Sequence, residues 1–371
     1  MIHGLFDLQF RLAKIDKNGD PLVKINQVVN WELFRPDLAA ANAAYRTAVR
    51  GHERKSDAGR PPADVIVVFK MSVIQSLYTL SDLATEQQCL DRLSFQRFLG
   101  LGLGDPVPDA NTLWNLKEAL KPNDLAKQLF RQFDDFLRNN GFEAHGGQIV
   151  DATIVRSPIR RDGKTVNEQV KNGDGEHVEE WSENARPQKD IDARWVKKNN
   201  KSFFGYKDHV SVDVKHTFVR QYEITAASTH DSQVYEELIT NNSSPEEHAD
   251  SAYPSEKRLA ARVKAKKVPL MQEKGTRGHP LTEAQQEANR EKSRVRSRVE
   301  HVFGQKLQRA GNMIIRCIGL VRAKVKLGLR NLAYNLERYA MLTLAGRGDK
   351  QGRGDAKGRG DAARTQEVMA S

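Results

Sequence analysis

One short run constrains the fold more than any other part of the sequence. Residues 148–155 are apolar and largely β-branched, with a single acid, Asp151, in their middle. They follow Gly146 and Gly147, and such a run is typical of a strand that is covered on both faces of a sheet. A carboxylate is costly to bury there unless it binds a cation or accepts hydrogen bonds. Asp151 is therefore predicted either to bind a cation or to bond a nearby loop.

The segments after this strand follow an order that indicates a mixed α/β domain. Strands are expected at 207–214 and 218–225 and just before Asp250, and helices at 232–240, 255–264 and about 282–309. The resulting order, β-β-β-α-β-α-α, matches a ribonuclease-H-like catalytic core, a mixed five-stranded sheet with helices. This domain is predicted to span residues 146–312, with a polar surface insertion at about 156–200 that shows no periodicity.

The residues before this domain indicate a separate helical unit. Apolar positions from Val65 to Leu80 follow the helical period, and Ser81 and Asp109 are placed to cap further helices. Residues 64–140 are therefore predicted to form an all-α domain of short helices, with the size and shape of a helix-turn-helix-like DNA-binding or dimerisation domain. Residues 1–63 show no comparable pattern and are predicted to be an irregular N-terminal arm.

The C-terminal residues divide into a helix and a tail. Residues 313–345 place apolar side chains such as Val325 and Leu332 on one side, which predicts a C-terminal helix. A Gly-Arg-Gly-Asp unit then recurs at 346–349, 352–355 and 358–361. This repeat is too rich in glycine and charge to bury a core, so residues 346–371 are predicted to be a disordered tail. Nothing else in the chain favours an adhesive role for the Arg-Gly-Asp triplets.

The charge balance favours a polyanionic partner. The chain has 59 Lys and Arg against 48 Asp and Glu, and residues 254–310 alone hold fifteen basic and six acidic residues. This basic stretch is either a phosphate-binding track or a solvated surface. Cys89 and Cys317 lie far apart in apolar segments, which argues against disulfides and cysteine-based zinc sites and fits a reducing cytoplasm. No uncharged stretch approaches the roughly 18 residues of a membrane helix, so no membrane partner is expected.

Two further acids stand where they can join Asp151 at one edge of the sheet. Asp250 follows a short segment and either binds a metal or caps a turn. Glu300 is the sole acid in the basic run 294–309, and Arg296 lies four residues before it on the same helical face. Arg296 either forms an ion pair with Glu300 or, in a DNA complex, binds a backbone phosphate beside the metals. Phosphodiester chemistry with two divalent ions needs about three such carboxylates.

Several motifs together carry a specific family resemblance. They lie at 59–62, 80–82, 93–101, 108–114, 149–153, 204–209, 249–253, 296–300 and 320–324. Over most of residues 30–340 the chain resembles the InsH-like DDE transposases of the bacterial insertion-sequence-five group. The resemblance implies an enzyme that binds insertion-sequence ends, cleaves DNA by metal-dependent phosphodiester hydrolysis and joins the 3′-hydroxyl ends to target DNA.

The resemblance also implies the site and the partners. Asp151, Asp250 and Glu300 are expected to be the catalytic triad that holds two ions of Mg²⁺ or Mn²⁺. The partner is expected to be double-stranded DNA, bound by a homodimer or higher oligomer that is cytoplasmic and associated with the nucleoid.

The helix that carries Glu300 departs from the family pattern. Related transposases often have a Tyr seven residues before the glutamate, an Arg four before it and a Lys seven after it. Those positions hold Ser293, Arg296 and Leu307, so only the arginine matches. The residues expected to bind DNA phosphates are Arg294, Arg296, Arg298, Lys306 and Lys207.

Other polar and aromatic residues are given plainer roles. His209, His230 and His301 lack the spacing of a zinc site, and they are expected to be exposed or to contact phosphate. Trp181 and Trp195 lie in the insertion and are expected to pack rather than to stack on an unpaired base.

Two other functions would use the same fold. One is a catalytically idle DNA-binding regulator derived from a transposase, against which the presence of all three acids argues. The other is a ribonuclease-H-like nuclease that does not transpose. Terminal inverted repeats flanking the gene would distinguish a transposase from such a nuclease.

Overall fold

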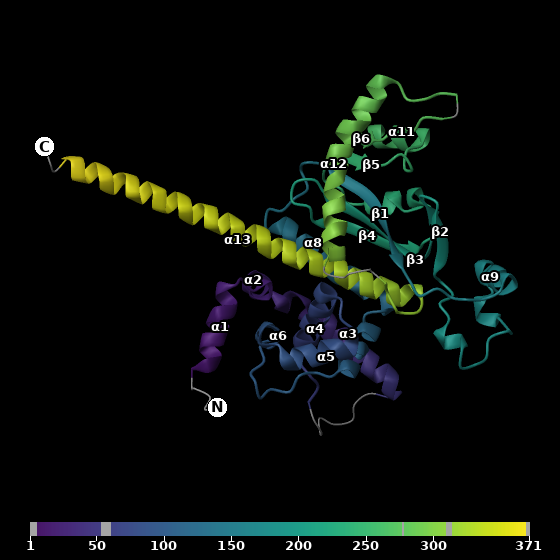
Figure 1. Cartoon of the computed structure of the whole chain (residues 1–371), viewed down its shortest axis with the longest axis horizontal. Helices are drawn as coiled ribbons and strands as arrows, with labels where there is room; N and C mark the ends of the chain where they lie inside the picture. The colour runs from purple at the N-terminus through teal and green to yellow at the C-terminus, as the bar shows by residue number, and fades with distance from the viewer. Residues whose placement is uncertain (1–5, 53–60, 277, 309–313, 369–371) are drawn as a thin grey trace.

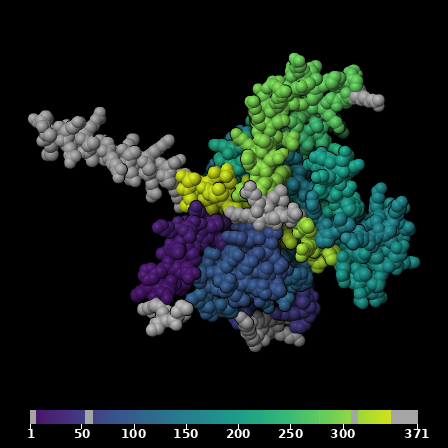
Figure 2. All heavy atoms as spheres, in the orientation of Figure 1, coloured from purple at the N-terminus to yellow at the C-terminus, as the bar shows by residue number. Residues whose placement is uncertain are grey.

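The computed structural model describes residues 6–52, 61–276, 278–308 and 314–368, without the side chains of 307–308 and 346–368. An upstream bundle of helices and a mixed sheet form its two halves. The long helix α13 (Leu320–Val368) passes between these halves (Figure 1), and its coloured atoms lie between the helical bundle and the sheet region in Figure 2.

A mixed sheet organises the second half of the chain. Its strands are β1 (Gln148–Arg156), β2 (Arg194–Lys198), β3 (Lys201–Asp213), β4 (Val219–Ala226), β5 (Glu246–Ala249) and β6 (Val268–Met271). β3 is antiparallel to β1, β2 and β4, whereas β5 is parallel to both β1 and β6. The order β4-β3-β1-β5-β6 is the five-stranded sheet of a ribonuclease-H-like fold, so the predicted fold class is confirmed. The insertion adds a sixth strand, β2, which the prediction lacks.

β1 is covered on both faces, as its apolar run predicts. On one face Ile149 belongs to the main core together with Val299 of α12 (Glu283–Gln308) and Leu332 of α13. On the other face Val150 packs with Tyr235 of α10 (Tyr235–Leu238) in a smaller core, beside α11 (Glu256–Lys264). A strand between two layers has no solvent face, which explains why its side chains do not alternate between apolar and polar.

The upstream helices occupy the residues for which helices are predicted. They are α4 (Val65–Tyr78), α5 (Asp82–Asp91), α6 (Leu93–Leu99), α7 (Ala110–Ala119) and α8 (Leu125–Asn139). Asp64, Ser81 and Asp109 each accept a hydrogen bond from a backbone N–H at the start of the helix that follows. These bonds satisfy N–H groups that have no partner within the helix.

The first part of the chain is helical, so the prediction of an irregular arm over 1–63 is wrong for the residues described. α1 (Asp7–Lys17), α2 (Pro21–Val28) and α3 (Arg35–Arg50) all lie there. Asp20 caps α2, whose first residue is Pro21, and α3 is rich in alanine, the strongest helix former. Residues 1–5 and 53–60 lie outside the description.

The insertion has more structure than its polar sequence predicts. It contains α9 (Lys164–Lys171) and a small core of its own, in which Val166, Val170 and Val178 surround Trp181. The four residues of this core are spread over so long a segment that they produce no periodic apolar pattern in the sequence. Trp181 packs in this core, as predicted.

The backbone also differs from the prediction at the C-terminus. α13 continues as a helix to Val368, whereas a disordered tail is predicted over 346–371. The six glycines of residues 346–368 disfavour a helix, but a helix that is already nucleated adds residues without a second nucleation cost. Residues 369–371 lie outside the description.

No single helix in the described part of the chain is both long and apolar enough to span a membrane. Only α4 and α5 taken together reach that length and composition, and they are bent by 104° relative to each other.

One hydrophobic core runs through both halves of the protein. α13 packs against α2, α4, α8 and β4, and its Leu332 and Leu336 are fully buried among residues of the helical bundle and of the sheet. The helical unit and the catalytic domain are predicted as separate domains, but α13 joins them into one packed structure.

Substitution of α13 residues tests this shared core. Leu332→Ala is expected to lower the free energy of unfolding by about 2–5 kcal/mol, because it leaves a cavity where the two halves meet. Val321→Ala on the same helix is the control, since Val321 is 52% exposed. Chemical denaturation should show a single transition that shifts for Leu332→Ala alone. Two transitions, of which only one shifts, would contradict a shared core.

Candidate active site

Asp151 and Asp250 lie next to each other where two parallel strands stop pairing. The pairing of β1 with β5 ends at Val150 and Ala249; Asp151 is the next residue within β1, and Asp250 directly follows β5. Adjacent strands are about 4.8 Å apart, so the two carboxylates emerge at the same level of the sheet. Burial raises the pKa of the Asp151 carboxyl, and the nearby charge of Asp250 adds to the rise.

Arg296 of α12 faces this acid pair. Its Nη2 lies 3.4 Å from Oδ2 of Asp151, and its Nη1 donates to Oε1 of Gln272 at 2.5 Å. The charge of Arg296 favours the ionised form of Asp151 and so opposes the effect of burial on its pKa. Arg296 thus links the helix to the acid.

Gln272 is a part of the site that the sequence did not reveal. It follows β6, whose Met271 pairs with Ala249, so it stands beside Asp250 at the same edge of the sheet. Its amide nitrogen donates to Oγ of Ser293 on α12 at 2.6 Å. The only sequence signal was the short apolar segment Val268–Met271, which contains a proline and gives a weak strand pattern.

Each acid also accepts a local backbone hydrogen bond. Oδ1 of Asp151 accepts from the N–H of Ala152, and Oδ1 of Asp250 accepts from the N–H of Ala252, both at 2.8 Å. The second bond is the turn-capping arrangement that the sequence offers as an alternative role for Asp250. These bonds orient both carboxylates and leave room for further ligands.

Glu300 is exposed on α12 and is not in contact with the pair. Within the described residues, no group of three His, Cys, Asp or Glu side chains is close enough to hold a metal ion. Arg298 donates to the backbone oxygen of Val214, which pairs with Gly147 just before β1. Glu300 lies about 200° around the helix from Arg298 and about 40° from Arg296. Glu300 therefore lies on the side of α12 from which Arg296 reaches Asp151.

Two family models match the chain. The one described as "Transposase DDE domain" matches residues 143–336, more than half of the chain, and the one described as "Transposase domain (DUF772)" matches residues 10–119. The chain belongs to the DDE transposase family. The two matches together indicate a DDE transposase of the insertion-sequence-five type and confirm the predicted resemblance, whereas membership of the InsH-like group stays a prediction.

One solved structure is also similar to this transposase. It is the synaptic complex of the piggyBac transposase with hairpin DNA, at 12% sequence identity and a TM-score of 0.48. The similarity covers 89% of this chain and 76% of that chain.

The acid pair of the transposase fits divalent ions, which DDE transposases generally use. Carboxylate oxygens are the ligands that Mg²⁺ and Mn²⁺ prefer. Among the described groups, the Tyr253 hydroxyl and Nε of Arg296 are buried without a hydrogen-bond partner. Burial and the charges of Asp231, Asp151 and Asp250 raise the pKa of Tyr253, which places its hydroxyl close to these acids. Polar groups without protein partners are expected where a site binds water, ions or substrate.

Two residues expected to bind DNA are inside the protein. Lys306 is 6% exposed, and its ammonium contacts Asn331 and Asp208 between α12, α13 and β3. The ammonium of Lys207 donates to the oxygen of Thr229 at 2.7 Å and to Asp231 at 2.8 Å. Both ammonium groups are buried and bonded within the protein in this structure, which argues against the predicted contacts with DNA phosphates. In contrast, Arg294 and Arg298 are exposed on α12.

The remaining histidines and Trp195 give a mixed outcome. His209 is fully buried, and Nε2 of its ring lies 2.9 Å from the Thr225 hydroxyl, so the expectation of an exposed side chain is wrong. Burial lowers the pKa of His209 to about 4. His230 and His301 are exposed, as predicted, and Trp195 contacts Phe204 but remains 46% exposed.

Lys306→Met tests whether Lys306 has a structural rather than a DNA-binding role. It leaves Asp208 buried without its cation, so it is expected to lower the free energy of unfolding by about 3–5 kcal/mol. It should leave the salt dependence of DNA binding unchanged, because Lys306 contacts no phosphate.

Arg294→Ala is the matched comparison, measured by denaturation and by DNA binding over a range of salt concentrations. It should reduce the slope of log K against log salt by about 0.9 with little effect on stability. A reduced slope for Lys306→Met would show that Lys306 reaches DNA after all.

Proposed function

We propose that this transposase binds the ends of an insertion sequence, hydrolyses a phosphodiester bond at each end and joins the freed 3′-hydroxyl to target DNA. The observation that carries the proposal is the register of β1 and β5, which sets Asp151 beside Asp250 at the edge of a ribonuclease-H-like sheet. Partly buried acids on adjacent strands repel each other, and this arrangement is costly unless cations bind there.

Asp151, Asp250 and Glu300 hold two divalent ions, Mg²⁺ or Mn²⁺, in this proposal. Two such ions activate the attacking oxygen, stabilise the leaving oxygen and neutralise charge on the phosphate. The assignment of Glu300 is supported by its position one helical turn from Arg296, on the flank of α12 nearest the pair. Its exposed side chain is not held by a contact with either acid in the structure.

Arg296 positions the reacting strand. Without a cation its guanidinium lies against Asp151, and Gln272 holds it there through a second hydrogen bond. When ions neutralise the acid, the same guanidinium can donate to a DNA phosphate, for which its geometry is well suited. Arg296 therefore offsets part of the effect of burial on Asp151 before binding and orients the DNA afterwards.

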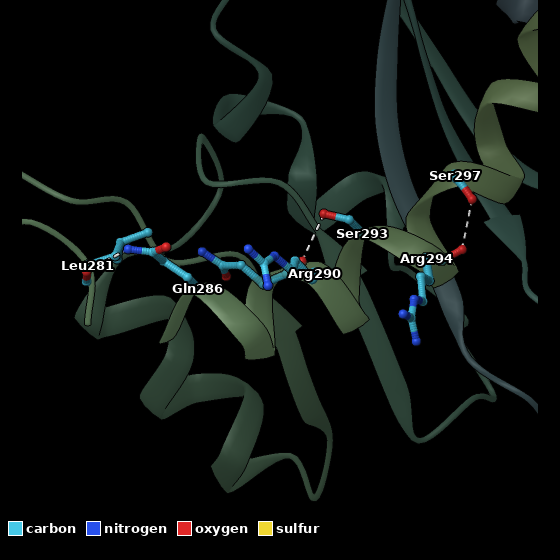
Figure 3. Close-up of a pocket in the computed structure, with 7 residues that line it drawn as sticks. Leu281, Gln286, Arg290, Ser293, Arg294 and Ser297 are labelled. Carbon is cyan, nitrogen blue, oxygen red and sulfur yellow. Dashed lines mark hydrogen bonds between the residues drawn. The ribbon is translucent and has the colours of Figure 1, made fainter. Parts of the chain in front are cut away.

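A shallow groove along α12 supports the binding of the DNA backbone. Figure 3 shows its polar side chains along the helix, with Arg294 projecting away from the ribbon; the groove is lined by Leu281, Gln286, Asn289, Arg290, Ser293, Arg294 and Ser297. Arginine, serine and asparagine side chains are common donors to phosphate oxygens. Together with Arg298, this surface forms a track that leads along the basic helix to Arg296.

Recognition of the ends and assembly complete the proposal. The helical unit over 64–140 recognises the end sequence, and the transposase acts on double-stranded DNA as a homodimer or higher oligomer. The support for these points is the match of the upstream helices to a transposase domain and the basic charge of the chain.

Neutral variants of the three acids test the chemistry. Asp151→Asn, Asp250→Asn and Glu300→Gln are each expected to abolish cleavage and strand transfer, because an amide lacks the charge that holds the ions. Binding to end DNA and thermal stability should stay close to wild type, and both serve as controls. The assay uses duplexes with the native element ends and Mg²⁺. Near-wild-type cleavage by one variant would show that the corresponding acid is wrongly assigned.

A comparison of two arginines on α12 tests the role of Arg296. Arg296→Ala should slow cleavage by about 10²-fold at saturating DNA, the usual cost of removing one positioned donor. Arg294→Ala should weaken binding but leave the rate at saturation unchanged, because Arg294 lies away from the acids. Equal rates in the two variants, measured at matched DNA occupancy, would show that Arg296 is only a structural partner of Asp151.

A further inference from the structure

The hairpin of β2 and β3, residues 194–205, leaves the sheet at a glycine. Gly205 pairs with both Arg156 of β1 and Arg194 of β2, and its φ is +149°. A Cβ at this position would lie 2.2 Å from the backbone oxygen of Val155 and 2.8 Å from the nitrogen of Ser157. Only glycine allows the backbones of β1 and β3 to come so close, so the hairpin depends on this residue.

The tip of the hairpin presents three lysines. Asn199 and Asn200 both have positive φ, which makes a tight two-residue turn. Lys197, Lys198 and Lys201 next to this turn are exposed, and none has a hydrogen bond or ion pair with any group that the structure describes. Lys198 pairs directly with Lys201 across the hairpin. Like charges placed opposite each other destabilise a strand pair, so this arrangement favours an anionic ligand.

An exposed aromatic ring lies on the same hairpin. Trp195 of β2 is 46% exposed, and its ring packs against the ring of Phe204, with ring centroids 5.3 Å apart. Arg156 stacks over the ring of Phe203, which directly precedes Phe204 in the sequence. A row of cations beside a supported aromatic ring is a frequent arrangement on surfaces that contact nucleic acids.

The hairpin extends the strand that pairs with β1, the strand of Asp151. β3 pairs with β1 from Gly205 to Asp213, and Val210 is the partner of Asp151 in this register. The residues of β3 before Gly205 pair with β2 as the hairpin. Figure 1 shows β2 at the outer edge of the sheet, beside β3 and β1. The lysines of the hairpin therefore lie on an extension of the sheet that carries the acid pair.

We propose that the tip of the β2–β3 hairpin is a clamp that binds the phosphate backbone of duplex DNA at the edge of the sheet that carries the acid pair. The inference rests on the proposed function and adds a second DNA contact, distinct from α12. Edge strands also carry lysines to prevent pairing with other chains. That role needs neither two opposed lysines at the turn nor an exposed tryptophan, and it predicts no effect on DNA binding.

The test compares two double variants of the full chain. Lys198→Ala with Lys201→Ala removes the opposed pair, and Lys164→Ala with Lys171→Ala removes two exposed lysines of α9 in the same insertion. Binding to a duplex with the native element end is measured over a range of salt concentrations. The hairpin variant should lose about 1.8 from the slope of log K against log salt, about 0.9 for each phosphate contact. The α9 variant should keep the wild-type slope.

Two outcomes separate failure of the clamp from failure of the proposed function. If the wild type binds and cleaves end DNA and the hairpin variant keeps the wild-type slope, the clamp is wrong and the proposed function stands. If the wild type neither binds nor cleaves end DNA, the proposed function is wrong, and the clamp that rests on it is wrong as well. Thermal stability of the hairpin variant should not decrease, because a pair of like charges is removed.

Discussion

The burial of Asp151 in a strand with no solvent face is the constraint on which the arrangement of the site depends. A carboxylate in that position needs a compensating charge, and Arg296 of α12 supplies one across the edge of the sheet. Gln272 holds Arg296 through a hydrogen bond and bonds Ser293 one turn earlier, so β6 and α12 are both tied to the acid. The same contacts place the Arg296 side of α12 beside the acid pair. Compensation of one partly buried charge thus brings Arg296 and Gln272 to the pair.

The shared core has a consequence for how the transposase uses DNA contacts. α13 packs simultaneously on the upstream helices and on β4, and Arg322 of α13 also forms an ion pair with Glu118 of α7 at 2.8 Å. The helical unit, for which we propose recognition of the DNA ends, is therefore fixed relative to the catalytic sheet rather than attached through a loose linker. The site that binds the end sequence and the site that binds the scissile phosphate would then lie at a fixed distance from each other within one subunit.

Elements with strong local patterns were predictable, and features that depend on distant partners were not. The β-branched run of β1, the capped helices α4 to α8 and the basic helix α12 follow local rules, so the fold class was correct. The short helices before residue 52 are stable because they bury residues such as Phe34 against the bundle, which no local pattern shows. Lys306 and Lys207 illustrate the same limit at the site. Their positive charge predicts a phosphate contact, but packing buries them beside Asp208 and Asp231, which lie far away in sequence or on another element.

The central claim is that Asp151, Asp250 and Glu300 together hold the divalent ions, although the structure brings only the first two side by side. Iron(II) bound in place of Mg²⁺ produces hydroxyl radicals that cut the polypeptide next to the ion. Peptide mapping of the full chain, bound to end DNA and treated with iron(II), ascorbate and peroxide, locates these cuts. The account predicts cuts near residues 151, 250 and 300 that excess Mg²⁺ suppresses. Cuts near 151 and 250 without one near 300, or cuts that Mg²⁺ does not suppress, would contradict it.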